Sequence, residues 1–141
     1  MPLKNYTTQV PADRSIHEIQ QALVKFGASG VAYEYEPGGR ILALMFRLTV
    51  SGHIAQFSLP VNWRLFQVVL KEQKVRGWQD EHYVYRVAWR NLRDWVLAQL
   101  ALYETAMVEL PQVFLPFVQN ASGRTLYEAV KANPKLLGDG Q

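Results

Sequence analysis

The sequence predicts an α+β fold in which a small antiparallel sheet precedes a long helix. Its 141 residues are 49% hydrophobic and 19% charged, a composition typical of a folded domain with an apolar core. Alternating apolar and polar residues, separated by turn residues, fill residues 31–59, and apolar residues at helical spacing dominate residues 62–109. We expect one domain, with a sheet and helix in 6–60, a helical part in 61–110 and a tail in 111–141.

The first predicted helix covers residues 14–26. Ser15 and Glu18 have the spacing of an N-terminal capping box, and Gly27 is a typical helix end. Apolar residues recur between them at helical spacing: Ile16, Ile19, Leu23 and Phe26. We therefore expect one buried face on this helix, and we expect the β-prone residues 6–10 before it to add an edge strand to the sheet.

Three strands are predicted at residues 31–36, 40–50 and 53–59. Pro37-Gly38-Gly39 supplies the turn between the first two strands, and Ser51-Gly52 supplies the second turn. Because both connections are short, the three strands are expected to form an antiparallel meander.

Two helices are predicted after the sheet, at residues 62–74 and 80–109. Gly77 separates them, and Pro111 is expected to end the second helix, which would span roughly 40 Å. Residues 95–107 are apolar on nearly every side, and one small sheet cannot cover such a helix. We therefore expect a subunit interface here, with the following VFLPFV segment exchanged across it, in a homo-oligomer.

The same long helix carries a basic stripe. Arg86, Arg90 and Arg93 recur at i, i+4 and i+7 and therefore lie on one face. Residues 61–93 contain seven Lys or Arg and three Asp or Glu, so this segment carries +4 while the rest of the chain carries −1. Guanidinium groups donate paired hydrogen bonds to phosphate and carboxylate. The stripe thus indicates an anion-binding face, and the alternative is a solvated face with helical ion pairs.

Aromatic and tail residues complete the predicted ligand site. Tyr83 and Trp89 lie near the stripe and are expected to stack on a base. Arg124 lies in a turn shortly before Tyr127, and this pair has two interpretations: part of a phosphate or ribose pocket, or a packed turn. Arg40, after the Gly-Gly turn, has the same two interpretations. The predicted ligand-binding residues are Arg86, Arg90, Arg93, Arg124, Trp89, Tyr83 and Tyr127.

Catalytic motifs are not found in the sequence. The chain has no cysteine, which excludes thiol catalysis, and its three histidines do not have metal-ligand spacing: His17, His53 and His82. A P-loop, a dinucleotide fingerprint and a nucleophile elbow are all missing. Glu34 and Glu36 have the spacing to share a proton, although a solvated strand face is the simpler interpretation. We expect a protein that is not an enzyme and binds no metal or cofactor.

The apolar segments are too short for a membrane span. No apolar run approaches about 18 residues, and residues 1–15 are mostly polar rather than leader-like. We therefore expect a cytoplasmic protein with no membrane partner.

Several segments together resemble a phage protein family. They are the opening YTTQV-P, the helix RVAWRNLRDWVLAQLALYE, the FLP tripeptide and GRTLYE. Their order is similar to that in small uncharacterised proteins encoded by bacteriophages and prophages, and the resemblance covers nearly the whole chain. It implies a location in the host cytoplasm, and by analogy a role like that of phage sponges that sequester nucleotide immune signals.

Three functional hypotheses follow. The first is a phage protein that sequesters a phosphorylated small ligand, such as a cyclic nucleotide or an ADP-ribose derivative, to counter host defence. The second is an accessory protein of phage replication or recombination that binds single-stranded or double-stranded nucleic acid. The third is a protein inhibitor of a host enzyme, which would bind through the sheet edge or the apolar helix. The net charge of +3 is small for a long nucleic-acid footprint, which favours the first hypothesis.

Overall fold

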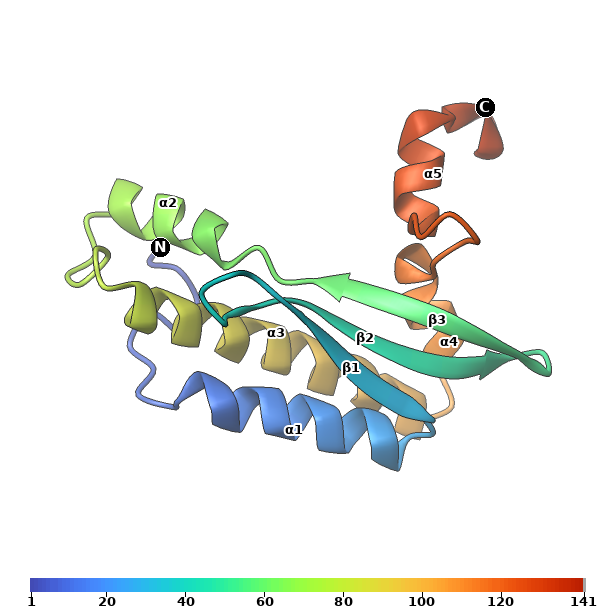
Figure 1. Cartoon of the computed structure of the whole chain (residues 1–141), viewed down its shortest axis with the longest axis horizontal. Helices are drawn as coiled ribbons and strands as arrows, with labels where there is room; N and C mark the ends of the chain where they lie inside the picture. Colours follow the sequence, from blue (N-terminus) through green and yellow to red (C-terminus); the bar gives the residue numbers. More distant parts are fainter. Residues whose placement is uncertain (141) are drawn as a thin grey trace.

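The computed structural model describes residues 1–140 and confirms the α+β fold class. Its elements are, in order, α1 (Ala12–Lys25), β1 (Gly30–Tyr35), β2 (Ile41–Val50), β3 (His53–Pro60), α2 (Trp63–Glu72), α3 (Glu81–Glu104), α4 (Leu110–Phe114), the 3-10 turn η1 (Leu115–Phe117), α5 (Leu126–Ala132) and the 3-10 turn η2 (Pro134–Leu136). Figure 1 shows α1 and α3 side by side along the sheet, with α2 at one end and the C-terminal elements at the other.

The three strands form the predicted antiparallel meander, in the order β1-β2-β3. One face of the sheet carries the large apolar side chains. On this face Phe46 stacks on its cross-strand partner Phe57 with ring centroids 5.4 Å apart, and Phe114 of α4 meets Phe46 edge-on at 5.1 Å. All three rings are buried, so α4 closes the core at the far end of the sheet.

A second aromatic cluster fills the other end of the core. Trp63 and Trp89 are fully buried, and Tyr85 lies between them with edge-on contacts at 5.8 Å and 6.2 Å. The Tyr85 hydroxyl accepts a hydrogen bond from the backbone N–H of Ile41 at 2.9 Å. Neither indole N–H has a hydrogen-bond partner among the described residues. This cluster joins the start of α2 to the middle of α3 and the start of β2.

Two predictions about the N-terminal region are wrong. Residues 6–10 form no strand, and the turn before them, with Asn5 at φ 67°, leads the chain across α3 instead. Helix α1 begins at Ala12, one turn earlier than the predicted capping box, because Pro11 with φ −59° takes the N-cap position. Ser15 therefore lies inside the helix, where it is fully buried against α3.

The long helix ends earlier than predicted. Helix α3 stops at Glu104 rather than at residue 109, because Ala106 takes a positive φ of 60° that breaks the helical path. Pro111 then lies in the first turn of α4, where a missing N–H costs nothing, so it starts a helix instead of ending one. No helix formed by residues 1–140 is both long and apolar enough to cross a membrane.

The last part of the described chain, residues 119–140, is here called the C-terminal arm. It is attached along β3, where the Gln119 N–H donates to the Gln56 carbonyl at 2.8 Å and Val118 pairs with Phe57. Within the arm, Thr125 and Glu128 form a reciprocal capping box that starts α5. Figure 1 shows α5 projecting beyond β3, away from α1 and from the end of α3.

Candidate functional site: a basic hollow beside the N-terminal end of helix α3

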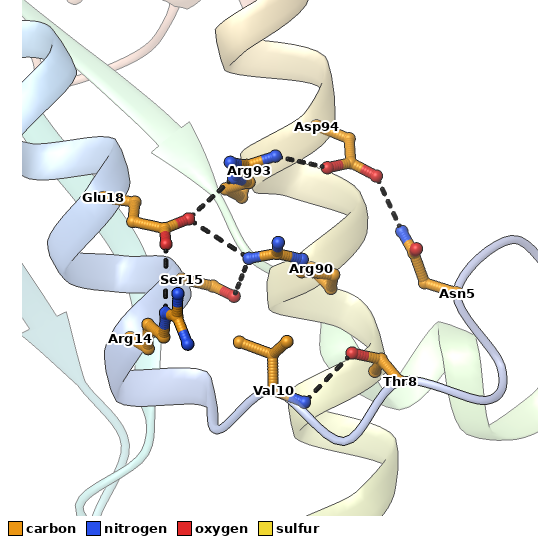
Figure 2. Close-up of polar contacts among 9 residues, drawn as sticks. All are labelled: Asn5, Thr8, Val10, Arg14, Ser15, Glu18, Arg90, Arg93 and Asp94. Atoms are coloured by element: carbon orange, nitrogen blue, oxygen red, sulfur yellow. Dashed lines mark hydrogen bonds and ion pairs between the residues drawn. The ribbon is translucent and has the colours of Figure 1, made fainter.

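The predicted arginine stripe faces helix α1. Figure 2 shows Arg90 and Arg93 pointing from α3 towards Glu18 on α1. Glu18 Oε2 accepts from Arg93 Nε at 2.7 Å and from Arg90 Nη1 at 3.1 Å, and Arg93 Nη1 also reaches Asp94 at 3.1 Å. Both arginine side chains are largely covered, with exposed fractions of 20% and 27%. Their charges thus join two helices, which corrects the prediction that the whole stripe is open to a ligand.

The acids in this network are held in their charged form. Partial burial by itself raises the pKa of Glu18, but the hydrogen bond from Arg93 and the charges of Arg93 and Arg90 outweigh it, so the pKa lies below its ordinary value of 4.5. Asp94 shows the same balance: burial is outweighed by hydrogen bonds from Asn5 and Arg93, and its pKa is lowered. These carboxylates occupy the guanidiniums that a phosphate would need.

The N-terminal strap, residues 1–10, covers the same face of α3. Four hydrogen bonds fasten it to α3, and in three of them an α3 side chain donates to a strap carbonyl. Arg86 Nε donates to the Thr8 carbonyl at 2.9 Å and Asn91 Nδ2 to the Lys4 carbonyl at 2.7 Å. The Tyr83 hydroxyl donates to the Tyr6 carbonyl, and Asn5 Nδ2 donates to Asp94 at 3.0 Å. Figure 2 shows the strap beside the arginine stripe.

Three other predicted site residues are not assembled with the stripe. Trp89 is fully buried in the core, so it has no open face on which a base could stack, and that prediction is corrected. Arg124 and Tyr127 lie in the C-terminal arm, which Figure 1 places at the opposite end of the molecule from the start of α3. Tyr127 is 59% exposed. The structure therefore does not bring the arm residues and the stripe into one site.

Two predicted residues do share a hollow, together with residues that were not predicted to belong to the site. Tyr83 and Arg86 line a hollow of about 490 Å³ between the strap, the α2–α3 loop and the start of α3. We call it the basic hollow. Its other lining residues are Tyr6, Thr7, Gln9, Val75, Arg76, Gly77 and Asp80. A second hollow of about 430 Å³ adjoins it, shares Tyr6, Val75 and Arg76, and adds Lys74.

The basic hollow combines positive charge with aromatic rings. The Arg86 guanidinium lies over the Tyr83 ring at 5.2 Å, while its Nε is fixed by the strap. Neither Arg76 nor Lys74 forms an ion pair with any residue in 1–140. Asp80 is the acid in the lining, and it accepts hydrogen bonds from the first N–H groups of α3 as a helix cap. The excess charge of the two hollows together is positive.

The pKa of Tyr83 supports a role as a neutral hydrogen-bond donor. Burial raises the pKa of its phenol, and the Arg86 guanidinium opposes this shift only in part. The hydroxyl therefore stays protonated at neutral pH and keeps its hydrogen bond to the Tyr6 carbonyl. That bond joins Tyr83 of α3 to the strap at Tyr6, and both residues line the hollow.

The shape of the α2–α3 loop explains how the hollow forms. Lys74 has a φ of 55° and Gly77 a φ of 94°, so the chain turns twice within four residues. Gly77 packs against the Tyr83 ring, where an added Cβ would lie 3.7 Å from it, and the neighbouring Arg76 is exposed and lines the hollow. The sequence pattern does not single out Arg76 and Lys74, although both belong to the segment with a charge of +4.

The other polar candidates are satisfied within the chain. Arg64 donates two hydrogen bonds to Glu36, at 2.7 Å and 3.3 Å. The hydrogen bond from Arg64 lowers the pKa of Glu36, so this carboxyl does not share a proton with Glu34. Arg40 pairs with Glu81 at 3.2 Å. Among residues 1–140, no group of three or more His, Asp or Glu side chains is arranged to hold a metal ion.

Comparisons of the chain with protein-family models, with curated proteins and with solved structures found no match.

Proposed function

We propose that the chain is a non-enzymatic protein that binds a phosphorylated small ligand of the nucleotide class in the basic hollow. The observation that carries the proposal is the meeting of Arg76 and Arg86 with Tyr6 and Tyr83 around one cavity. A volume of about 490 Å³ falls within the usual range for small-ligand pockets, about 300–1,000 Å³.

The chemistry of the lining fits the two ends of a nucleotide. Arg76 forms no ion pair among the described residues, and Arg86 uses its Nε on the strap, so guanidinium N–H groups remain for phosphate oxygens. Tyr6 is 38% exposed and offers a ring face to a base. The phosphate would lie near the two arginines and the base near Tyr6, because Tyr83 is only 9% exposed and its ring is covered by the Arg86 guanidinium.

Sequestration is the role that we propose for this binding. The resemblance to phage proteins suggests a nucleotide immune signal of the host as the ligand, either a cyclic nucleotide or an ADP-ribose derivative. A sponge of this kind needs tight, stoichiometric binding without turnover. Its residues are then selected for charge and stacking rather than for acid–base chemistry.

Calorimetric titration of the full chain with cyclic mononucleotides, cyclic dinucleotides and ADP-ribose tests the proposal. We expect one of these ligands to bind without being converted. Arg76→Glu is expected to weaken that binding about 10–100-fold, because a guanidinium that donates hydrogen bonds to the phosphate is replaced by a carboxylate that repels it. Arg76 is exposed, so the variant is expected to fold.

Arg124→Glu is the matched control, because Arg124 is also an exposed arginine and lies in the C-terminal arm. We expect its affinity to equal that of the unmodified chain. No heat with any of these ligands would contradict the proposal, and so would an Arg124→Glu variant that weakens binding as much as Arg76→Glu. Retention of nucleic acid or of a host protein, with no nucleotide bound, would favour the alternative hypotheses instead.

A further inference from the structure

The C-terminal arm carries an apolar surface that its own chain leaves uncovered. Helix α5 has only seven residues and contains no buried residue, and it packs on the neighbouring turns η1 and η2. Helices shorter than about 12–15 residues are marginal in water without tertiary packing. Three large side chains of the arm are mostly exposed: Tyr127 at 59%, Leu136 at 60% and Leu137 at 61%. The arm therefore lacks the burial that would stabilise it.

A hollow with apolar and polar walls lies at the end of the molecule where the β2–β3 hairpin turns. It has a volume of about 510 Å³ and is enclosed by the end of α1, the β2–β3 hairpin, the end of α3 and the start of α4. We call it the terminal hollow. Its walls include Phe26, Leu48, Val50, Tyr103 and Leu110. Phe26 and Tyr103 meet edge-on at 5.2 Å, so the aromatic part of the wall is fixed.

Acids near the hollow and lysines of the arm have opposite charges, while Lys25 lies over the Phe26 ring of the wall and Asp139 follows the exposed leucines. Glu109 is the charged residue in the lining of the terminal hollow, and Glu104 follows Tyr103 at the end of α3. Helix α3 has no basic residue in its last turn, so the negative end of its dipole adds to these acids. The arm carries Lys131 and Lys135 beside its exposed leucines, while its Glu128 is occupied by the capping box.

We propose that the C-terminal arm of one copy docks into the terminal hollow of a second copy, which forms a homodimer. The exposed leucines would lie against the apolar part of the hollow's wall, and the two lysines would face the acids at the end of α3 and in the polar part of the wall. Figure 1 shows α5 projecting away from the end of α3, so the arm does not reach its own hollow in this arrangement. A two-fold axis gives each copy one arm and one hollow, so that both contacts form at once.

Sedimentation equilibrium of the full chain over a concentration series tests this dimer. We expect a dimer for the unmodified protein and a dissociation constant raised about 10–100-fold in Leu137→Asp, because a buried leucine is replaced by a charge. Leu65→Asp on α2 is the matched control, since Leu65 is 60% exposed against 61% for Leu137. This control is expected to dimerise like the unmodified chain.

A charge exchange tests the docking position itself. Glu104→Lys and Lys135→Glu are each expected to weaken the dimer about 3–10-fold, and the double variant is expected to restore it, since the pair of charges is then reversed. A monomer at every concentration would overturn the proposal. It would also be overturned by a dimer that Leu137→Asp leaves intact, or by a double variant that is weaker than both single variants.

Discussion

Trp89→Ala is expected to lower the free energy of unfolding by about 3–5 kcal/mol, the usual cost of removing a large aromatic side chain from a core. Trp89 is fully buried and packs edge-on against Tyr85, which in turn contacts Trp63. The substitution leaves a cavity beside Tyr85, whose ring contacts Trp63 of α2 and whose hydroxyl accepts from Ile41 of β2, and so weakens the packing of α3 against both elements. Urea unfolding followed by circular dichroism measures the change.

Trp89→Phe is the control for this prediction. It keeps an aromatic ring in the cluster and removes an indole N–H that has no partner among the described residues. We expect a loss well below that of Trp89→Ala, since only part of the volume is removed. A loss of less than about 1 kcal/mol in the free energy of unfolding of Trp89→Ala would contradict the placement of Trp89 in the core. Trp89 would then be open to stack on a ligand.

Glu18→Gln is expected to lower the free energy of unfolding at pH 7 by about 1–3 kcal/mol. Glu18 accepts hydrogen bonds from Arg90, Arg93 and Arg14, and its side chain is 25% exposed. Glutamine keeps the shape of the Glu18 side chain but removes the negative charge that faces Arg90 and Arg93, which are both partly buried. The change therefore leaves two guanidiniums with weaker partners at the α1–α3 contact.

The pH dependence of this effect has a definite sign. The folded-state pKa of Glu18 lies below its ordinary value of 4.5, so its contribution to stability is complete above that value and is lost as the pH falls through the folded-state pKa. The difference between the unmodified chain and Glu18→Gln should therefore shrink in acid. The pKa of Asp94 is also lowered, but its contribution to the pH dependence cancels in this difference, because both proteins contain Asp94.

Glu34→Gln is the control, because Glu34 is exposed and forms no ion pair with another described residue. We expect its unfolding curve at pH 7 to match that of the unmodified chain. Equal stability of Glu18→Gln and the unmodified chain at pH 7 would show that the arginines need no partner on α1. In that case the arginine stripe would again be a candidate ligand-binding face.

The meander and the helices were predictable because their signals are local. The turn at Pro37-Gly38-Gly39 and the turn at Ser51-Gly52 lie between alternating segments, and both turns form as predicted. Helix ends were less predictable, because a competing local conformation decides them. Pro111 was expected to end the long helix, yet the positive φ of Ala106 ends it first.

The arginine stripe shows why the site could be predicted only in part. Helical spacing placed Arg90 and Arg93 on one face, but it did not indicate which element covers that face. Their partner Glu18 lies more than 70 residues away, and the sequence pattern assigned Glu18 to a capping box with Ser15 instead. Contacts between residues so distant in the chain depend on tertiary packing, which periodicity does not report.

The basic hollow had the same mixture of local and distant signals. Tyr83 and Arg86 are one turn apart on a helix, so their proximity follows from the sequence. Tyr6 lies near these two residues because the strap crosses α3. Arg76 lies near them because the loop turns at Gly77, which packs against Tyr83. Neither feature has a sequence signature of its own.

The proposed function requires that the basic hollow, and not the arm or the full stripe, holds the phosphorylated ligand. A two-dimensional NMR titration of the ¹⁵N-labelled full chain with cyclic mononucleotides, cyclic dinucleotides and ADP-ribose, and separately with inorganic pyrophosphate, tests this placement. We expect shift changes concentrated in residues 6–9 and 74–86, including the side-chain Nε–H signals of Arg76 and Arg86. Changes concentrated in residues 124–127, or no changes with any of these compounds, would contradict binding in the basic hollow.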